Sequence, residues 1–270
     1  MNECFLSNTV SPEVTAILNW WVPRIQDIFD NNLRGVFLFG GVALGEFEPC
    51  WSDVDTCVAV RSPVTAAQAA SLNATLIEMD DLFGRQGASG WRSKQTVQGA
   101  VITLRQAIDI GLAEMCFYAW SSKGFHETCD PLSPFDRYQL AHCRKLISGN
   151  DVDFAKPERA ALLEMTTKDL NSLEDAARNP EGYGVGTIAS LLHWAARSLI
   201  FWRDGVLLAK SAALRNEINS GSPFAEAFQL ALAVRERGRE YLPQYENAIR
   251  NILRQFGSAI CKEHTRLLHL

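Results

Sequence analysis

The sequence lacks the features of a membrane-spanning, secreted or disulfide-stabilised protein. No run of residues approaches the roughly 20 apolar residues that cross a bilayer. The first ten residues, MNECFLSNTV, show no basic flank followed by an apolar stretch, so we expect no signal peptide. The seven cysteines are scattered and include no CxxC pair, which is typical of free thiols in a reducing compartment. We therefore expect a cytoplasmic protein that does not contact membranes.

An excess of positive charge is also missing. The chain has 26 Lys and Arg against 31 Asp and Glu, a net charge of −5. Long nucleic acids are held mainly by Lys and Arg on phosphates, so this balance predicts no nucleic-acid partner. A small anionic ligand needs only a local positive site, and a cationic small molecule would suit an acidic surface. The oligomeric state stays open between a monomer and a homodimer.

The residue pattern changes character about halfway along the 270 residues. The first half mixes periods typical of helices and of strands, and from residue 157 onward almost only helical periodicity is found. We expect an α+β protein: residues 1–153 would form a domain with a small mixed sheet flanked by helices, and residues 154–270 an all-helical domain. The elements predicted in the first domain are helices over 12–30, 63–83 and 135–147, antiparallel strands over 35–40 and 54–60, a loop over 84–99, and one or two strands over 101–120.

Two carboxylates at alternate positions carry the clearest chemical signal. Gly40 and Gly41 follow the first predicted strand, and the run Ser52-Asp53-Val54-Asp55 enters the second. Side chains at i and i+2 of a strand share one face, so Asp53 and Asp55 would project together. Two such charges are unfavourable unless a cation lies between them, and Mg²⁺ prefers hard oxygen ligands. The glycines allow the backbone N–H groups to approach phosphates.

This order of strand, paired glycines, short loop, Ser and DxD resembles the nucleotidyltransferase superfamily typified by DNA polymerase beta. Within it the chain looks most like the aminoglycoside adenylyltransferases of the streptomycin/spectinomycin type. The resemblance implies that Gly40, Gly41 and Ser52 contact the nucleotide and that Asp53 and Asp55 are catalytic metal ligands. The chain departs from the family pattern at Gly41, where the family carries Ser, and its loop is slightly longer.

The resemblance extends to three further residues. Asp109, in the run AIDIGLA, falls where the family carries a third carboxylate on a later strand, which acts as general base and metal ligand; Glu114 is the substitute candidate. In the helical half, Arg197 and Lys210 are separated by a turn containing Gly205, as in the adenylyltransferases. By resemblance, Arg197 and Lys210 reach the triphosphate across an interdomain cleft, where they would neutralise the departing pyrophosphate.

The implied activity is magnesium-dependent transfer of an adenylyl group from ATP to a hydroxyl of a small molecule. An aminoglycoside or aminocyclitol is the first acceptor we expect, because such cations suit a site rich in carboxylates. In the streptomycin-modifying enzymes that the chain resembles, a Trp and an Asp just before the Arg-bearing helix contact the drug. The corresponding stretch here, ARNPEGYGVGTIAS, offers Glu181 and Tyr183 but no equivalent Asp, which argues against streptomycin. Two alternatives stay open. One is a protein-directed nucleotidyltransferase of the toxin–antitoxin kind. The other is an inert nucleotide-binding homologue, which Gly41 suggests because it replaces the Ser of the family.

Overall fold

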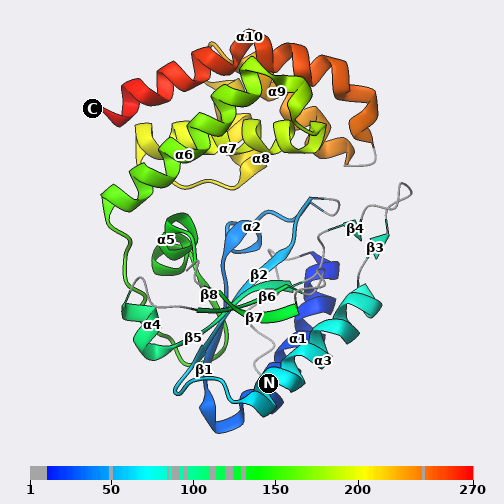
Figure 1. Ribbon diagram of the computed structural model, residues 1–270, viewed down its shortest axis with the longest axis vertical. Coiled ribbons are helices and arrows are strands. Elements are labelled where there is room, and N and C mark those ends of the chain that lie inside the picture. Colours follow the sequence, from blue (N-terminus) through cyan, green and yellow to red (C-terminus); the bar gives the residue numbers. More distant parts are fainter. Residues whose placement is uncertain are drawn as a thin grey trace. The chain divides into compact units, whose positions relative to one another are not determined.

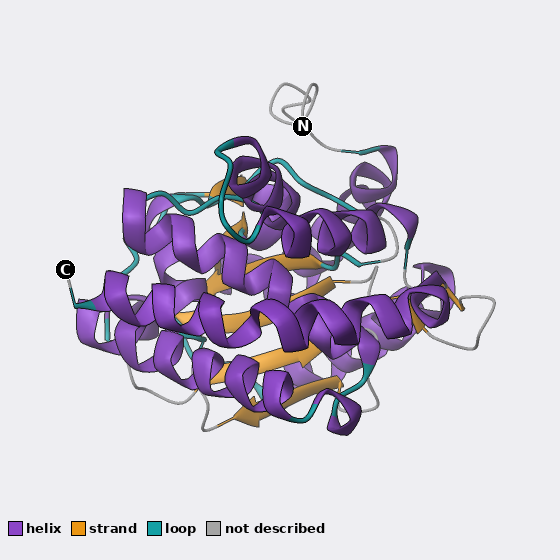
Figure 2. Cartoon of the chain, turned by 90° about the horizontal axis from the view of Figure 1, so that it is seen from above, coloured by secondary structure: helices purple, strands orange, loops and turns teal. Residues whose placement is uncertain are grey.

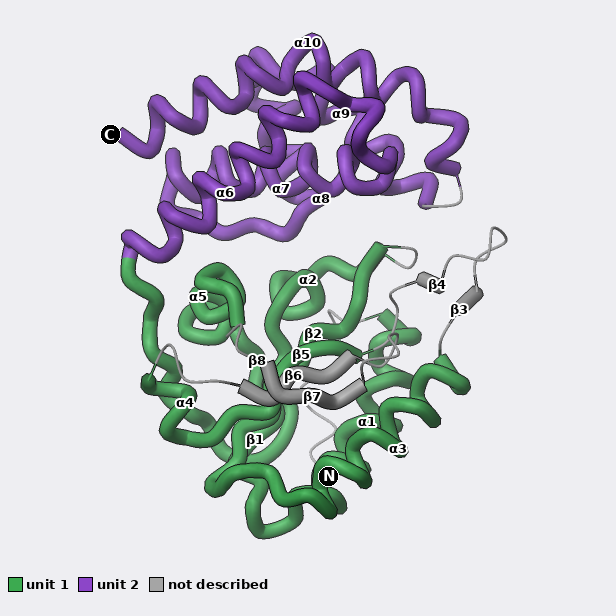
Figure 3. The backbone as a smooth tube through the Cα atoms, viewed as in Figure 1, with its two compact units in different colours: residues 1–158 green, residues 159–270 purple. Residues whose placement is uncertain are grey.

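The chain folds into two compact units, Met1–Glu158 and Arg159–Leu270 (Figure 3). The computed structural model describes residues 11–48, 51–83, 85–86, 92–93, 97–109, 114–118, 124–128, 132–238 and 241–269. The sequence places the domain boundary after residue 153. Val152 and Phe154 are buried in the core of the first unit, which accounts for a division beyond that point.

A mixed six-stranded sheet forms the centre of the first unit as far as the structure describes it (Figures 1 and 2). Its order is β7-β6-β5-β2-β1-β8; β2 and β5 run parallel, and the other neighbouring pairs are antiparallel. The predicted mixed sheet and the antiparallel pairing of the first two strands are confirmed. The strands are β1 (Leu33–Leu38), β2 (Val54–Val60), β5 (Val97–Thr103), β6 (Glu114–Tyr118), β7 (Gly124–Thr128) and β8 (Lys145–Gly149), with β3 (Arg85–Gln86) and β4 (Arg92–Ser93) forming a separate pair.

Helices cover both faces of this sheet. On one face α1 (Pro12–Phe29) and α3 (Ala66–Phe83) contribute an apolar core that includes Trp21 and Leu76. Ser11 caps α1, since its Oγ accepts a hydrogen bond from the N–H of Val14 at 3.3 Å. The opposite face packs against α4 (Leu104–Ile108), α5 (Pro134–His142) and the segment around Phe154. The remaining elements are the short α2 (Gly40–Ala43) and the 3₁₀ turn η1 (Asp30–Asn32).

The segment after β5 corrects one prediction. The alternation in AIDIGLA suggested a strand, but Leu104–Ile108 is helical and Asp109 is the C-cap of that helix. The cause is a capping box: the Thr103 Oγ1 accepts a hydrogen bond from the Gln106 N–H at 3.2 Å, and the Gln106 Oε1 accepts one from the Thr103 N–H at 2.7 Å. These reciprocal bonds start a helix at the last residue of β5.

The second unit is all-helical in its described residues, as predicted. Its helices are α6 (Arg159–Arg178), α7 (Val185–Asp204), α8 (Lys210–Asn219), α9 (Ala225–Arg237) and α10 (Leu242–Leu268), with the 3₁₀ turn η2 (Pro180–Gly182). The long α10 packs against both α6 and α7. Among the described helices, none combines the length and the apolar character that crossing a membrane requires.

A buried imidazole lies in the core of this unit. His264 on α10 is fully buried and stacks on Trp194 of α7, with ring centroids 5.8 Å apart and an interplanar angle of 9°. Its Nδ1 lies 3.0 Å from the carbonyl oxygen of Ile260. Burial lowers the pKa of His264 to about 4, so the folded protein holds this side chain neutral at physiological pH.

We expect acid to destabilise the protein through His264. An unfolded His titrates near 6.5 and the folded one near 4, so the unfolded state binds the proton more tightly. The stabilisation is complete above pH 6.5 and is lost as the pH falls towards 4, by about 3 kcal/mol in all. Urea unfolding between pH 7.5 and 4 should show a steeper loss in the wild type than in His264→Phe, which keeps an aromatic ring but cannot titrate.

Asp169 also titrates in this pH range, but it does not disturb the comparison between wild type and variant. Burial raises its pKa to about 6, so its contribution falls as the pH rises, opposite in sign to that of His264. Because Asp169 is present in both proteins, its effect cancels in the difference between them. Parallel pH profiles for wild type and variant would contradict the role of His264.

Candidate functional site

Asp53 and Asp55 lie where the chain enters β2, Asp55 as the second residue of the strand and Asp53 immediately before its first residue. Both side chains are half-buried. The N–H of Phe39 donates a hydrogen bond to the carbonyl oxygen of Asp55 at 3.1 Å, which extends the β1–β2 ladder to this end of the sheet. The two predicted carboxylates therefore lie at the first end of a paired strand, at positions i and i+2 that share a face where the chain is extended.

Gly40 forms the surface on which the Asp55 carboxylate rests. Its φ is +68°, a left-handed conformation that favours glycine. A Cβ atom built on Gly40 would lie 1.8 Å from Oδ2 of Asp55, so any side chain would displace the carboxylate. Gly41 is different: a Cβ there would lie 3.2 Å from the carbonyl oxygen of Glu46, and a small side chain would require only a slight shift.

Ser52 closes the loop that returns the chain to β2. Its Oγ accepts a hydrogen bond from the N–H of Glu48 at 2.9 Å, and its own N–H donates to the carbonyl oxygen of Glu48 at 2.8 Å. The side chain is buried, next to the buried Trp51. The structure thus gives Ser52 a part in shaping the loop, and its contact with a nucleotide stays a prediction.

Gln98 is the residue that sequence reasoning missed at this site. The parallel register pairs Asp55 with Gln98 on β5, and the Gln98 Nε2 donates a hydrogen bond to Oδ1 of Asp55 at 2.9 Å. The next residue, Gly99, has a φ of +149°, and a Cβ on it would lie 1.7 Å from the carbonyl oxygen of Thr56. Glycine at 99 therefore allows β5 to approach β2 in this register. A polar residue near the start of an apolar strand was the only signal in the sequence.

The structure does not bring Asp109 to the pair. From Gln98 to Thr103, β5 runs away from Asp55 for about 16 Å, at roughly 3.3 Å per residue, and Asp109 follows beyond its far end. The Asp109 side chain is half exposed and lies 4.0 Å from the Nε of Arg105. The substitute Glu114 is at the same far end, because its neighbour Met115 pairs with Val101.

Arg197 and Lys210 belong to the second unit. Arg197 is half-buried on α7, and Gly205 ends that helix in a left-handed conformation with φ +71°, as the predicted turn requires. Lys210 is exposed at the first position of α8, a helix whose N-terminus has no side-chain cap. A cation at this end opposes the helix dipole at a cost of about 0.3–1 kcal/mol. The contact of Lys210 with phosphate stays a prediction.

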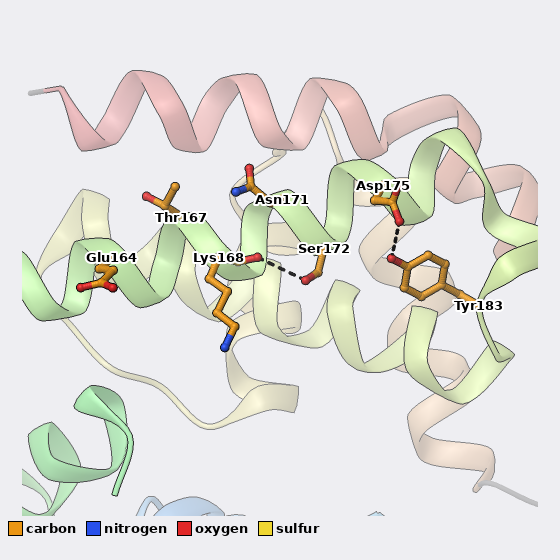
Figure 4. Close-up of a pocket in the computed structure, with 7 residues that line it drawn as sticks. All are labelled: Glu164, Thr167, Lys168, Asn171, Ser172, Asp175 and Tyr183. Carbon is orange, nitrogen blue, oxygen red and sulfur yellow. Dashed lines mark hydrogen bonds between the residues drawn. The ribbon is translucent and has the colours of Figure 1, made fainter. Parts of the chain in front are cut away.

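The second unit also contains a polar groove along α6 (Figure 4). Its volume is about 580 Å³, the size of a small-molecule site. The Oη of Tyr183 donates a hydrogen bond to Oδ2 of Asp175 at 2.6 Å, which raises the pKa of the Tyr183 phenol. We call this the α6 groove; it is lined by Glu164, Thr167, Lys168, Asn171, Ser172, Asp175 and Tyr183.

Asp53 and Asp55 are suited to a hard divalent cation. Their carboxylate oxygens are the ligands that Mg²⁺ prefers, and two protein ligands leave coordination positions for water and phosphate oxygens. Within the described part of the chain, no group of three His, Cys, Asp or Glu side chains is close enough to share an ion. A cation at this place would therefore be held by the pair, with the Gln98 amide beside it.

The solved structures that share this fold include the spectinomycin adenyltransferase AAD(9) from Enterococcus faecialis, solved with ATP and spectinomycin. The two chains are 16% identical and superpose with a TM-score of 0.62, over 88% of this chain and 98% of the other. No protein-family model matches the chain, and neither does any curated protein sequence. The chain thus has the α+β nucleotidyltransferase fold, as the sequence predicts.

We expect Gly40→Ala to disrupt the Asp55 site selectively. Gly45 provides a matched control, since its φ is +84° but a Cβ on it would meet no atom within 4 Å. Each substitution carries the backbone cost of a left-handed alanine, about 1 kcal/mol, and only the one at Gly40 also displaces the carboxylate. Calorimetric titration with Mg²⁺ and ATP should show weakened binding for Gly40→Ala and unchanged binding for Gly45→Ala. Equal binding by both variants would contradict this geometry.

Proposed function

We propose that the protein is a magnesium-dependent nucleotidyltransferase that moves the adenylyl group of ATP to a hydroxyl of a small molecule. The observation that carries the proposal is the Asp53–Asp55 pair at the entry to β2, with the Asp55 carboxylate against Gly40, in a nucleotidyltransferase fold. The similar fold of an adenyltransferase solved with ATP supports ATP as the donor.

In this proposal Asp53 and Asp55 would hold the divalent cation that the reaction requires. When bound, Mg²⁺ supplies charge neutralisation on the phosphate oxygens. The acceptor hydroxyl oxygen forms a bond to the α-phosphorus while the bond from that phosphorus to the oxygen bridging it to the β-phosphate breaks. Pyrophosphate leaves, and the hydroxyl proton passes to solvent water. Asp109 has no part in this step, because it lies at the far end of β5.

Arg197 and Lys210 are proposed to bind the phosphates that depart. The guanidinium can donate two hydrogen bonds to phosphate oxygens, and the ammonium acts as a point charge. The place of Lys210 at a helix N-terminus supports this role, since an anion there would interact with both the helix dipole and the side chain.

The α6 groove is the proposed acceptor site. Its carboxylates, Glu164 and Asp175, suit the ammonium groups of an aminoglycoside or aminocyclitol, and its hydroxyl and amide groups suit the sugar hydroxyls. Tyr183, which the sequence placed in the acceptor-binding stretch, lines the groove. The spectinomycin in the similar structure makes an aminocyclitol the first acceptor to test.

An inert nucleotide-binding homologue is the second candidate. Two observations favour it: Gly41 brings no hydroxyl to the loop, and the amide of Gln98, which cannot accept a proton as a base would, lies beside Asp55. Binding of Mg²⁺ and ATP without turnover on any acceptor would support this candidate. Adenylylation of a partner protein, detected by mass spectrometry, would instead support a protein-directed enzyme.

We expect the purified protein to release pyrophosphate from ATP and Mg²⁺ when a suitable acceptor is present. A panel of aminocyclitols and aminoglycosides, beginning with spectinomycin, would identify the acceptor. Asp53→Asn and Asp55→Asn should each lower the rate by about 100-fold or more, because the charge that holds the cation is halved. Asp109→Asn is the matched control and should keep the wild-type rate. Undiminished release by the Asp53 and Asp55 variants would overturn the assignment.

Substitutions in the α6 groove should affect the acceptor alone. Glu164→Gln and Asp175→Asn remove negative charge without changing side-chain size, so the KM for a cationic acceptor should rise about tenfold, the effect of losing one ion pair in a polar site. The KM for ATP should stay the same. Glu158→Gln, outside the groove, serves as the control. Unchanged acceptor KM values in both groove variants would show that the acceptor binds elsewhere.

A further inference from the structure

We infer that Gln98 is a positioning residue, which orients the Asp55 carboxylate for the cation and its nucleotide. The inference rests on the proposed function. Asp55 is held from two sides: Oδ2 lies against the backbone of Gly40, and Oδ1 accepts a hydrogen bond from the Gln98 Nε2 at 2.9 Å. The carboxylate plane is therefore set by two different elements, the turn after β1 and the strand β5.

The direction of this hydrogen bond follows from charge. The carboxamide offers an N–H₂ group and a carbonyl oxygen, and only the former attracts a carboxylate. With the opposite orientation, the Gln98 oxygen would face the Asp55 oxygen and repel it. The Nε2 therefore faces Asp55, and the amide holds the carboxylate without neutralising its charge.

The backbone keeps Gln98 and Asp55 side by side. Seven consecutive residues of β2 and β5 pair in register, from Val54 with Val97 to Val60 with Thr103. Gly99 lets the two backbones come close, because a side chain there would meet the carbonyl of Thr56. The backbone of Gln98 thus cannot move away from that of Asp55 without breaking the central pairing of the sheet. A residue held beside a proposed metal ligand affects how that ligand binds the metal.

Because the Gln98 side chain is a neutral amide, it adds no negative charge to the two carboxylates of the site. A carboxylate would bring a third negative charge to Asp53 and Asp55 and bind a cation more tightly, while repelling Asp55 when no cation is present. Gln98 supplies the hydrogen bond without that charge. The structure therefore assigns the site two anionic ligands and one neutral positioning residue.

Two substitutions of Gln98 separate positioning from simple packing. Gln98→Met keeps the length of the side chain and removes the hydrogen bond, whereas Gln98→Glu keeps the length and adds a charge. Gln26→Met is the matched control, since the Gln26 amide also donates a hydrogen bond, to Ser148 Oγ at 2.8 Å, in a different part of the unit. Circular dichroism and thermal unfolding without metal establish that each variant folds.

The measurement is the affinity for Mn²⁺, and for Mn²⁺ with an ATP analogue that cannot be cleaved between the α- and β-phosphates, by electron paramagnetic resonance and calorimetry. We expect Gln98→Met to bind about tenfold more weakly, because Asp55 loses its orientation. Gln98→Glu should bind more tightly, on the order of tenfold, and lose thermal stability in the absence of metal. Gln26→Met should match the wild type.

Opposite changes in affinity are the signature of a positioning residue, since a packing role would weaken binding in both variants. Weaker binding in both, or unchanged binding in both, would overturn the role of Gln98 while leaving the proposed function intact. A wild-type protein that binds neither Mn²⁺ nor the analogue would overturn the proposed function itself, and the role of Gln98 with it.

Discussion

The parallel pairing of β2 with β5 is the constraint on which the candidate site depends. Both strands lie inside the sheet, with antiparallel neighbours outside them, so their register is fixed by buried apolar residues on both faces. This register determines which residue of β5 lies beside Asp55. It makes that residue Gln98 and sends the chain away from the site before it reaches Asp109.

Glycine makes this arrangement possible at two points. Gly40 leaves room for the Asp55 carboxylate, and Gly99 leaves room for the backbone of β2. Both have backbone conformations that other residues rarely adopt, so the site requires glycine at these two positions. Ser52 adds to this by closing the loop before β2 through its hydrogen bond with Glu48.

The two units divide the proposed chemistry between them. The first contains the carboxylates that would hold a cation, and the second contains Arg197, Lys210 and the α6 groove, which would hold the phosphates and the acceptor. At the proposed nucleotide site Gln98 brings an amide without charge, and Gly41 brings no hydroxyl. The fold that the chain shares with an adenyltransferase does not by itself fix the chemistry, which depends on such residues.

The sequence by itself determined the parts of this protein that depend on local pattern. The period of its apolar residues predicts the mixed sheet and the helical second half, and the spacing of Asp53 and Asp55 puts both at the start of a strand. The capping box at Thr103 and Gln106 was also readable, although the alternation after it suggested a strand. Tertiary structure alone decided which residue accompanies the pair. Asp109 and Gln98 are both polar residues near a strand, and only the register of β5 against β2 places the amide beside Asp55 and the carboxylate at the other end of the sheet. Register is set by contacts between segments some 40 residues apart, and no local pattern encodes it.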